Sequence, residues 1–106
     1  MSASPQVTRA LDAARAAFAR SDWEAAREHF QLALDSETSA ETLDGLGQSL
    51  WWLGEEEAAL ELRTKAFAEY QRRGDADAAA NIAIYLAAEY RIAGNASVAN
   101  SLAKPD

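Results

Sequence analysis

The sequence predicts an all-α protein built from antiparallel helix hairpins. Alanine, the residue that most favours helix, supplies 26 of the 106 residues. No segment shows the alternation of β-branched and polar residues that is typical of a half-buried strand. Apolar residues instead recur three and four positions apart between short Gly, Asp or Ser turn signals. These observations predict five long helices plus a short sixth, in a single domain over residues 1–106.

The first hairpin begins at Ser4 and Pro5. Ser4 is a good N-cap and Pro5 suits the first position of a helix, which we expect to end near Arg20 and Ser21. Asp22 is the expected N-cap of the second helix, and a loop follows at residues 35–38. The apolar positions of this hairpin are Val7, Ala10, Leu11, Ala14, Ala17, Phe18, Trp23, Ala26, Phe30, Ala33 and Leu34.

The second hairpin has stronger boundary signals. Residues 38–41 (Thr-Ser-Ala-Glu) fit a capping box, and Gly54 is expected to end the third helix in a left-handed conformation. Residues 55–57 are three glutamates, whose charges complement the dipole at the start of the fourth helix. Two arginines followed by Gly74 indicate where that helix ends.

Asp75 is the expected N-cap of the fifth helix. We expect Gly94 to end it and Asn95 to cap the short sixth helix, which carries Val98 and Leu102. So short a helix covers its neighbour poorly, which leaves an apolar patch of Ile82, Tyr85, Leu86 and Ile92. A homodimer through this C-terminal end is therefore an expectation.

The hairpins repeat along the chain. Their turn signals, Ser21, Gly54 and Gly94, recur at intervals of about one hairpin, and the second interval is longer than the first. An alanine lies five positions after each of these turns, at Ala26, Ala59 and Ala99. Together with Leu46-Gly47, this pattern resembles the tetratricopeptide repeat, a helix–turn–helix unit of about 34 residues. The resemblance implies a right-handed solenoid with repeats at about 7–38, 40–74 and 75–103, the last one truncated.

Some positions depart from that repeat, and a narrower resemblance exists as well. Arg63 stands where the repeat has an aromatic residue, and the terminal proline is missing. Two segments, DWEAAREHFQLAL and ETLDGLGQSLWWLGEEEAALELRTKAFAEYQRRGD, resemble the helical-repeat segment of bacterial transcriptional regulators of the LuxR type. This resemblance implies an alternative function, a regulatory or sensor segment of such a regulator whose DNA-binding helix-turn-helix is absent from this chain.

Composition argues against several classes of function. Ten basic residues against seventeen acidic ones give a net charge of −7, which disfavours direct nucleic-acid binding. No apolar run approaches the length that a membrane-spanning helix needs, so we expect no membrane association. The first residues do not form a secretory signal. A cytoplasmic location is the simplest expectation.

No residue pattern predicts catalysis. The chain has no Cys, which excludes thiol chemistry and a Cys-zinc site, and its only His, His29, lacks evident partners. The glutamates at 55–57 point in different directions and cannot hold one ion together. We therefore predict a protein that is not an enzyme and that has no cofactor and no metal.

The adjacent residues Trp51 and Trp52 are the most informative feature for binding. Neighbouring helix positions differ by about 100°, so both rings cannot share the buried stripe. Either one ring faces a groove or a neighbouring chain, with Trp51 the favoured anchor and removable without loss of the fold, or both rings pack between repeats. Tryptophan is enriched among the residues that dominate binding energy.

The resemblance implies that the first helix of each hairpin lines a concave groove for a protein or peptide partner. Such a groove is mainly apolar with arginines at its edges, which suits a peptide or helix with hydrophobic anchors and an acidic group. The predicted partner-binding residues are Leu11, Arg15, Phe18, Gln48, Trp51, Trp52, Asn81, Ile84 and Arg91.

Overall fold

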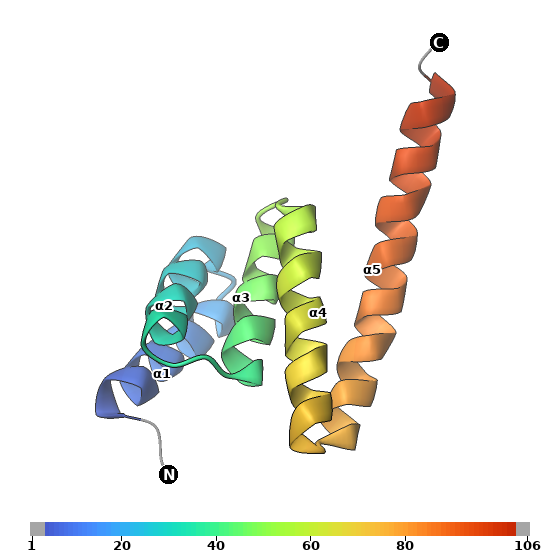
Figure 1. Cartoon of the computed structure of the whole chain (residues 1–106). Helices are drawn as coiled ribbons and strands as arrows, with labels where there is room; N and C mark the ends of the chain where they lie inside the picture. Colours follow the sequence, from blue (N-terminus) through green and yellow to red (C-terminus); the bar gives the residue numbers. More distant parts are fainter. Residues whose placement is uncertain (1–3, 104–106) are drawn as a thin grey trace.

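Residues 4–103 form five helices (Figure 1). The computed structural model describes residues 4–103, apart from the side chains of Ala93 and of residues 95–103. The helices pack as consecutive antiparallel pairs, which confirms the predicted all-α class and hairpin arrangement. They are α1 (Pro5–Ala19), α2 (Trp23–Ser36), α3 (Ala40–Trp52), α4 (Glu56–Arg73) and α5 (Ala76–Ala103).

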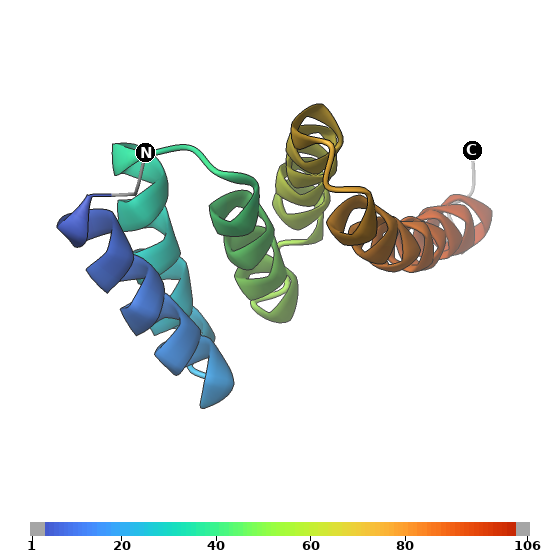
Figure 2. The ribbon, with the colours of Figure 1, turned by 90° about the horizontal axis from the view of Figure 1, so that it is seen from below.

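The helices form two rows. Each helix makes its main contacts with the helix before it and the helix after it in the chain. Viewed along the helices, α1, α3 and α5 lie toward one side and α2 and α4 toward the other (Figure 2). The side formed by α1, α3 and α5 is the one that matters for the candidate site.

The helix starts agree with the capping signals in the sequence. The side chains of Ser4 and Asp22 each accept a hydrogen bond of 3.2 Å from the backbone N–H three residues later, as does Asp75 at the start of α5. The predicted capping box is displaced by one residue. Ser39 is the N-cap, and its hydroxyl bonds both the backbone N–H and the side chain of Thr42.

The turns after α1, α3 and α4 share one geometry, whereas α2 ends in an extended residue, Glu37. Ser21, Gly54 and Gly74 have positive φ angles of 61°, 86° and 77°. At each turn the next residue donates its N–H to the carbonyl five positions earlier, at 2.9 Å. This hydrogen bond satisfies a carbonyl that the end of the helix leaves free. The expectation for Gly54 is therefore confirmed.

The predicted break at Gly94 is wrong. Residues 76–103 form a single helix, so the structure has no separate sixth helix. Gly94 is not among the described glycines with a positive φ. One glycine inside a helix costs only about 1 kcal/mol relative to alanine, which the alanine-rich surroundings tolerate. The predicted cap at Asn95 and the cover by Val98 and Leu102 involve side chains outside the described part.

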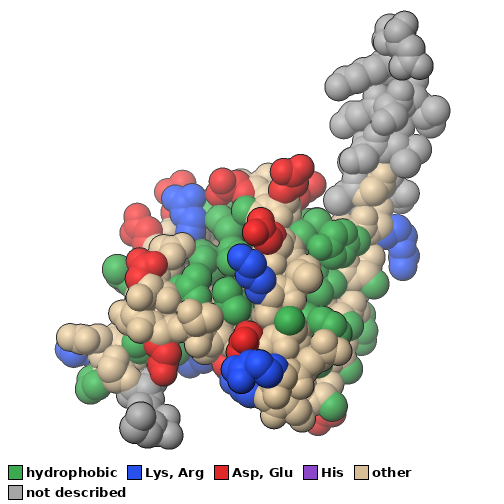
Figure 3. All heavy atoms as spheres, in the orientation of Figure 1, with side chains coloured by type: hydrophobic (Ala, Val, Ile, Leu, Met, Phe, Trp, Pro, Cys, Tyr) green, Lys and Arg blue, Asp and Glu red, His purple; other side chains and the backbone are tan. Residues whose placement is uncertain are grey.

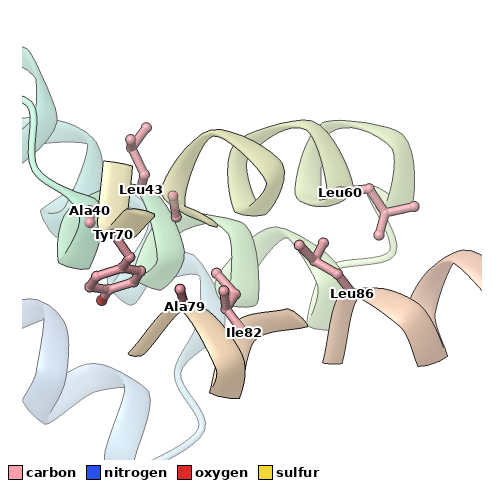
Figure 4. Close-up of a cluster of buried hydrophobic side chains, with 8 residues drawn as sticks. Ala40, Leu43, Leu60, Tyr70, Ala79, Ile82 and Leu86 are labelled. Carbon is pink, nitrogen blue, oxygen red and sulfur yellow. The ribbon is translucent and has the colours of Figure 1, made fainter. Parts of the chain in front are cut away.

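Two clusters of buried apolar side chains hold the helices together. One cluster contains side chains of α1, α2, α3 and α4 and includes Phe30, Leu46 and Leu50. The other joins α3, α4 and α5, where Leu60 of α4 lies close to Leu86 of α5 (Figure 4). Leu34, Trp51 and Leu62 pack against both clusters and so connect them.

Glycines in α3 allow the neighbouring helices to come close. A methyl group on Gly45 would overlap the Phe30 ring of α2. A methyl group on Gly47 would overlap Arg63 Cγ of α4 and lie 3.1 Å from the Ala59 carbonyl oxygen. The absence of side chains at these positions therefore sets the spacing of α2, α3 and α4.

Candidate functional site

A groove runs along the side of the molecule formed by α1, α3 and α5. Its main hollow has a volume of about 580 Å³, and a second hollow of about 330 Å³ adjoins it. Both are lined by Phe18, Asp44, Gln48 and Tyr70, so we treat them as one groove. A continuous concave surface of this size can hold a short peptide segment or several side chains of a partner.

Two helices form the walls of the main hollow. Asp44, Gln48 and Trp51 are four and three positions apart, which places them on one face of α3. The opposite wall comes from α5, where residues at similar spacings line the hollow. These are Asn81, Tyr85, Ala88 and Ile92.

An ion network lies at the floor of this hollow. Arg63 of α4 is only 4% exposed. Its Nε donates to Asp44 Oδ1 at 3.1 Å, and its Nη1 donates to both carboxylate oxygens of Glu89 at 2.6 and 2.7 Å. The guanidinium also lies 5.4 Å from the centre of the Tyr85 ring. We call Asp44, Arg63 and Glu89 the Arg63 network; it ties α3, α4 and α5 together beneath the groove.

The Arg63 network has an excess of negative charge. Two carboxylates and one guanidinium leave one net negative charge at the floor of the hollow. Burial raises the pKa of Glu89, and the negative charge of Asp44 raises it further, although Arg63 acts in the opposite direction. The Asp44 side chain is 21% exposed and that of Glu89 10%, so Asp44 is the more accessible of the two acids.

Aromatic side chains gather at the other end of the α3 wall. Trp52 is 60% exposed and stacks on Trp23 of α2, with ring centres 5.3 Å apart and planes at 12°. Trp23 in turn meets the edge of Phe18 of α1, at 4.9 Å. Trp51 is half-buried and packs against both core clusters while it lines the hollow. Trp52, not Trp51, is therefore the exposed member of the pair.

The packing of Trp51 has a consequence for the favoured anchor. A ring that contacts both core clusters contributes to the fold, which argues against the expectation that Trp51 can be removed without loss of the fold. Trp52 has a large free surface and a rigid support in Trp23, which are the properties of an anchor for a partner.

The structure brings six of the nine predicted site residues to the groove. Five of them line the main hollow, and Arg15 lines the adjoining one. The five are Phe18, Gln48, Trp51, Trp52 and Asn81.

The other three predicted residues lie outside the groove. Leu11 is partly buried against the first core cluster. Ile84 is 68% exposed and Arg91 is also exposed, and neither lines a hollow. On α5 Tyr85 and Ile92, each one position further along, line the hollow together with Asn81 and Ala88. Ile82 and Leu86 pack in the core cluster with α4, and Glu89 pairs with Arg63 of α4.

The four residues of the apolar patch expected at the C-terminal end fall into two groups. Ile82 and Leu86 are buried against α4, whereas Tyr85 and Ile92 remain exposed and line the hollow. Sequence reasoning did not select Arg63, Glu89 or Tyr85 as site residues. The available signal was Arg63 itself, a charged residue at a position where the repeat has an aromatic side chain.

The opposite side of the molecule has a different surface. Charged side chains of both signs are spread over α2 and α4, and hydrophobic side chains are visible along α5 (Figure 3). Within residues 4–103, no helix combines the length and the apolar character needed to cross a membrane. Nor does that part of the chain bring three or more His, Cys, Asp or Glu side chains together as a metal site would.

No family model, curated protein or solved structure matches the chain.

Proposed function

We propose that the chain is a non-catalytic protein-interaction module, a right-handed solenoid of the tetratricopeptide type that binds a peptide or helix of a partner protein in its groove. The observation that carries this proposal is the hollow of about 580 Å³ between α3 and α5, with the exposed Trp52 at one end. A concave, largely preformed surface with a rigid aromatic anchor is typical of peptide recognition.

The repeat geometry supports the solenoid part of the proposal. Ser21 and Gly54, which form the turns of the first and second hairpins, both have positive φ and the same hydrogen bond. The alanines that recur in the second helix of each hairpin are fully buried in both. They are Ala26 and Ala33 in α2, and Ala59 and Ala66 in α4. Equivalent turns and equivalent small contacts are what stacked copies of one helical unit require.

A selection from a random peptide library tests the binding function. Peptides retained by the immobilised chain are synthesised, and their affinities are measured by fluorescence anisotropy. We expect Trp52→Ala to weaken binding by about tenfold or more, since truncation of an aromatic hot spot costs about 2 kcal/mol. Tyr85→Ala, on the opposite wall, is expected to act in the same direction.

Leu32→Ala provides the matched control. Leu32 is also a large exposed apolar residue, but it lies on α2 outside the groove. Its replacement should leave the affinity unchanged, and circular dichroism should show that every variant retains its helix content. The proposal fails if no peptide is retained, or if Leu32→Ala weakens binding as much as Trp52→Ala and Tyr85→Ala do.

A further inference from the structure

The charges that line the groove differ from those expected from the sequence. Two arginines were expected at its edges, but Arg91 lies outside it and Arg15 lines only the adjoining hollow. The main hollow contains Asp44 and Glu89, with Arg63 between them. An acidic group of a partner would therefore approach an excess of negative charge, which is unfavourable.

Arg63 offers little attraction to an incoming anion. It is almost completely buried, and two of its nitrogens already donate to Asp44 and Glu89. The carboxylates keep more capacity, because Asp44 accepts through Oδ1 and a carboxylate has about four acceptor positions.

The polar and aromatic parts of the groove lie at different positions along the helix axes. Asp44 and Trp51 are seven positions apart on one face of α3, which separates them by about 10 Å along the helix axis. An extended segment covers that distance in about three residues, and a helical segment in about seven. On the opposite wall Asn81 and Ile92 show the same change from polar to apolar toward the end of the groove.

We propose that the partner segment places a basic side chain, best an arginine, against Asp44 and an apolar side chain, two helical turns further along the groove, against Trp51 and Trp52. This inference rests on the proposed function and specifies the partner. A guanidinium fits because it donates in a planar fork to a carboxylate and stacks on aromatic rings, and the Tyr85 ring lies beside the Arg63 network. The net charge of −7 further assists the approach of a basic segment.

The peptides retained in the library selection provide the first test. We expect Arg and Lys to be enriched over Asp and Glu at one position, with an apolar residue enriched about three positions away in extended binders or about seven in helical ones. In the tightest binder the basic residue is then replaced by citrulline for Arg or norleucine for Lys, which removes the charge and keeps the length. The wild-type chain should bind the neutral peptide about tenfold more weakly, the usual effect of losing a charged hydrogen bond.

Two variants of the chain assign that effect to the groove. Asp44→Asn keeps an oxygen that can accept from Arg63 but removes the carboxylate. The affinities of this variant for the neutral and the basic peptide should therefore differ less than about twofold. Gln48→Glu adds a carboxylate one turn away on the same wall and should strengthen binding of the basic peptide. Gln48→Glu also keeps the test decisive if Asp44→Asn fails to fold. Glu24→Gln, an exposed acid on α2 outside the groove, is the matched control and should change neither affinity.

The outcomes separate this inference from the proposed function. If no peptide is retained, the proposed function fails and the inference fails with it. If peptides bind and depend on Trp52 but are enriched in acidic residues, or are indifferent to citrulline or norleucine, only the inference is overturned. If neutralising the peptide lowers its affinity equally for the wild type and for Asp44→Asn, the basic side chain binds elsewhere, and this result would also overturn the inference.

Discussion

Ser21 carries a cost that its counterpart in the second hairpin avoids. Within residues 4–103 it is the only residue other than glycine with a positive φ, at 61°, and Gly54 occupies the equivalent turn. A left-handed backbone costs an ordinary residue roughly 1–2 kcal/mol, and the greater flexibility of glycine in the unfolded chain offsets part of any gain. We expect Ser21→Gly to raise the free energy of unfolding by about 0.5–1 kcal/mol, measured by urea denaturation.

Gly54→Ala tests the same reasoning in reverse. A methyl group at Gly54 meets no atom within 4 Å, so only backbone strain opposes it. The variant should lose about 1 kcal/mol of stability. A loss of stability in Ser21→Gly, or a gain in Gly54→Ala, would show that the two turns do not depend on left-handed geometry.

Of the residues in the groove, Arg63 is the one whose role was least evident from the sequence. Its partners lie 19 and 26 positions away, and no local pattern connects them. Removing one member of a buried ion network leaves the other charges uncompensated. We expect Arg63→Met to reduce the free energy of unfolding by about 3 kcal/mol at pH 7. Lys65→Met, whose exposed pair with Glu61 spans 3.6 Å, should cost less than about 0.5 kcal/mol.

The effect of Arg63→Met should depend on pH. The pKa of Glu89 in the folded chain is raised above its ordinary value of 4.5, so its contribution to stability is present below that value and is lost as pH rises through the folded pKa. Without Arg63 the pKa of Glu89 rises further, because only burial and Asp44 then act on it. Urea denaturation of Arg63→Met should therefore show a smaller loss near pH 4 than at pH 7. An equal loss at both values would mean that the cost comes from packing alone.

The glycines of α3 act through the spacing of whole helices. In an open helix, replacing glycine with alanine stabilises by about 1 kcal/mol. At Gly47 the added methyl group would overlap Arg63 Cγ, so we expect Gly47→Ala instead to destabilise by about 1–2 kcal/mol. Thermal unfolding measured by circular dichroism would check this, and a rise in melting temperature would contradict the close packing of α3 on α4.

Gly94 is the matched control within α5. It is helical, and a methyl group there meets no atom within 4 Å. Gly94→Ala should therefore gain up to about 1 kcal/mol and increase the helix signal. If Gly94 instead ended the helix in a left-handed turn, as the sequence suggested, the same substitution would lower both the free energy of unfolding and the helix signal.

The arrangement of the five helices predicts uneven stability across the molecule. Each helix contacts mainly its neighbours in the chain, so α1 and α5 at the ends have one principal partner each, and α3 and α4 have two. In such an array the end units open most easily. We expect backbone amides of α3 and α4 to exchange with solvent at least tenfold more slowly than those of α1 and α5, measured by hydrogen exchange. A single rate for all protected amides would indicate that the chain opens only as a whole.

The sequence was sufficient to predict the helices and most of their ends. Side chains such as Ser4, Asp22 and Asp75 cap the backbone three residues away, and such short-range hydrogen bonds can be read along the chain. The apolar spacing likewise identified the buried alanines of the first hairpin, such as Ala14, Ala17 and Ala26, because the period of a helix depends only on local geometry. Six of the nine site residues predicted from the repeat resemblance reach the groove.

Tertiary contacts decided the rest. The direction of Tyr85 and Ile92 into the groove and the different surroundings of Trp51 and Trp52 depend on neighbouring helices. The Arg63 network, which sets the charge of the groove, joins residues from three helices. Local signals reach only about one helical turn along the chain, whereas packing chooses among helix rotations that are locally equivalent, and that choice determines which side chains meet a partner.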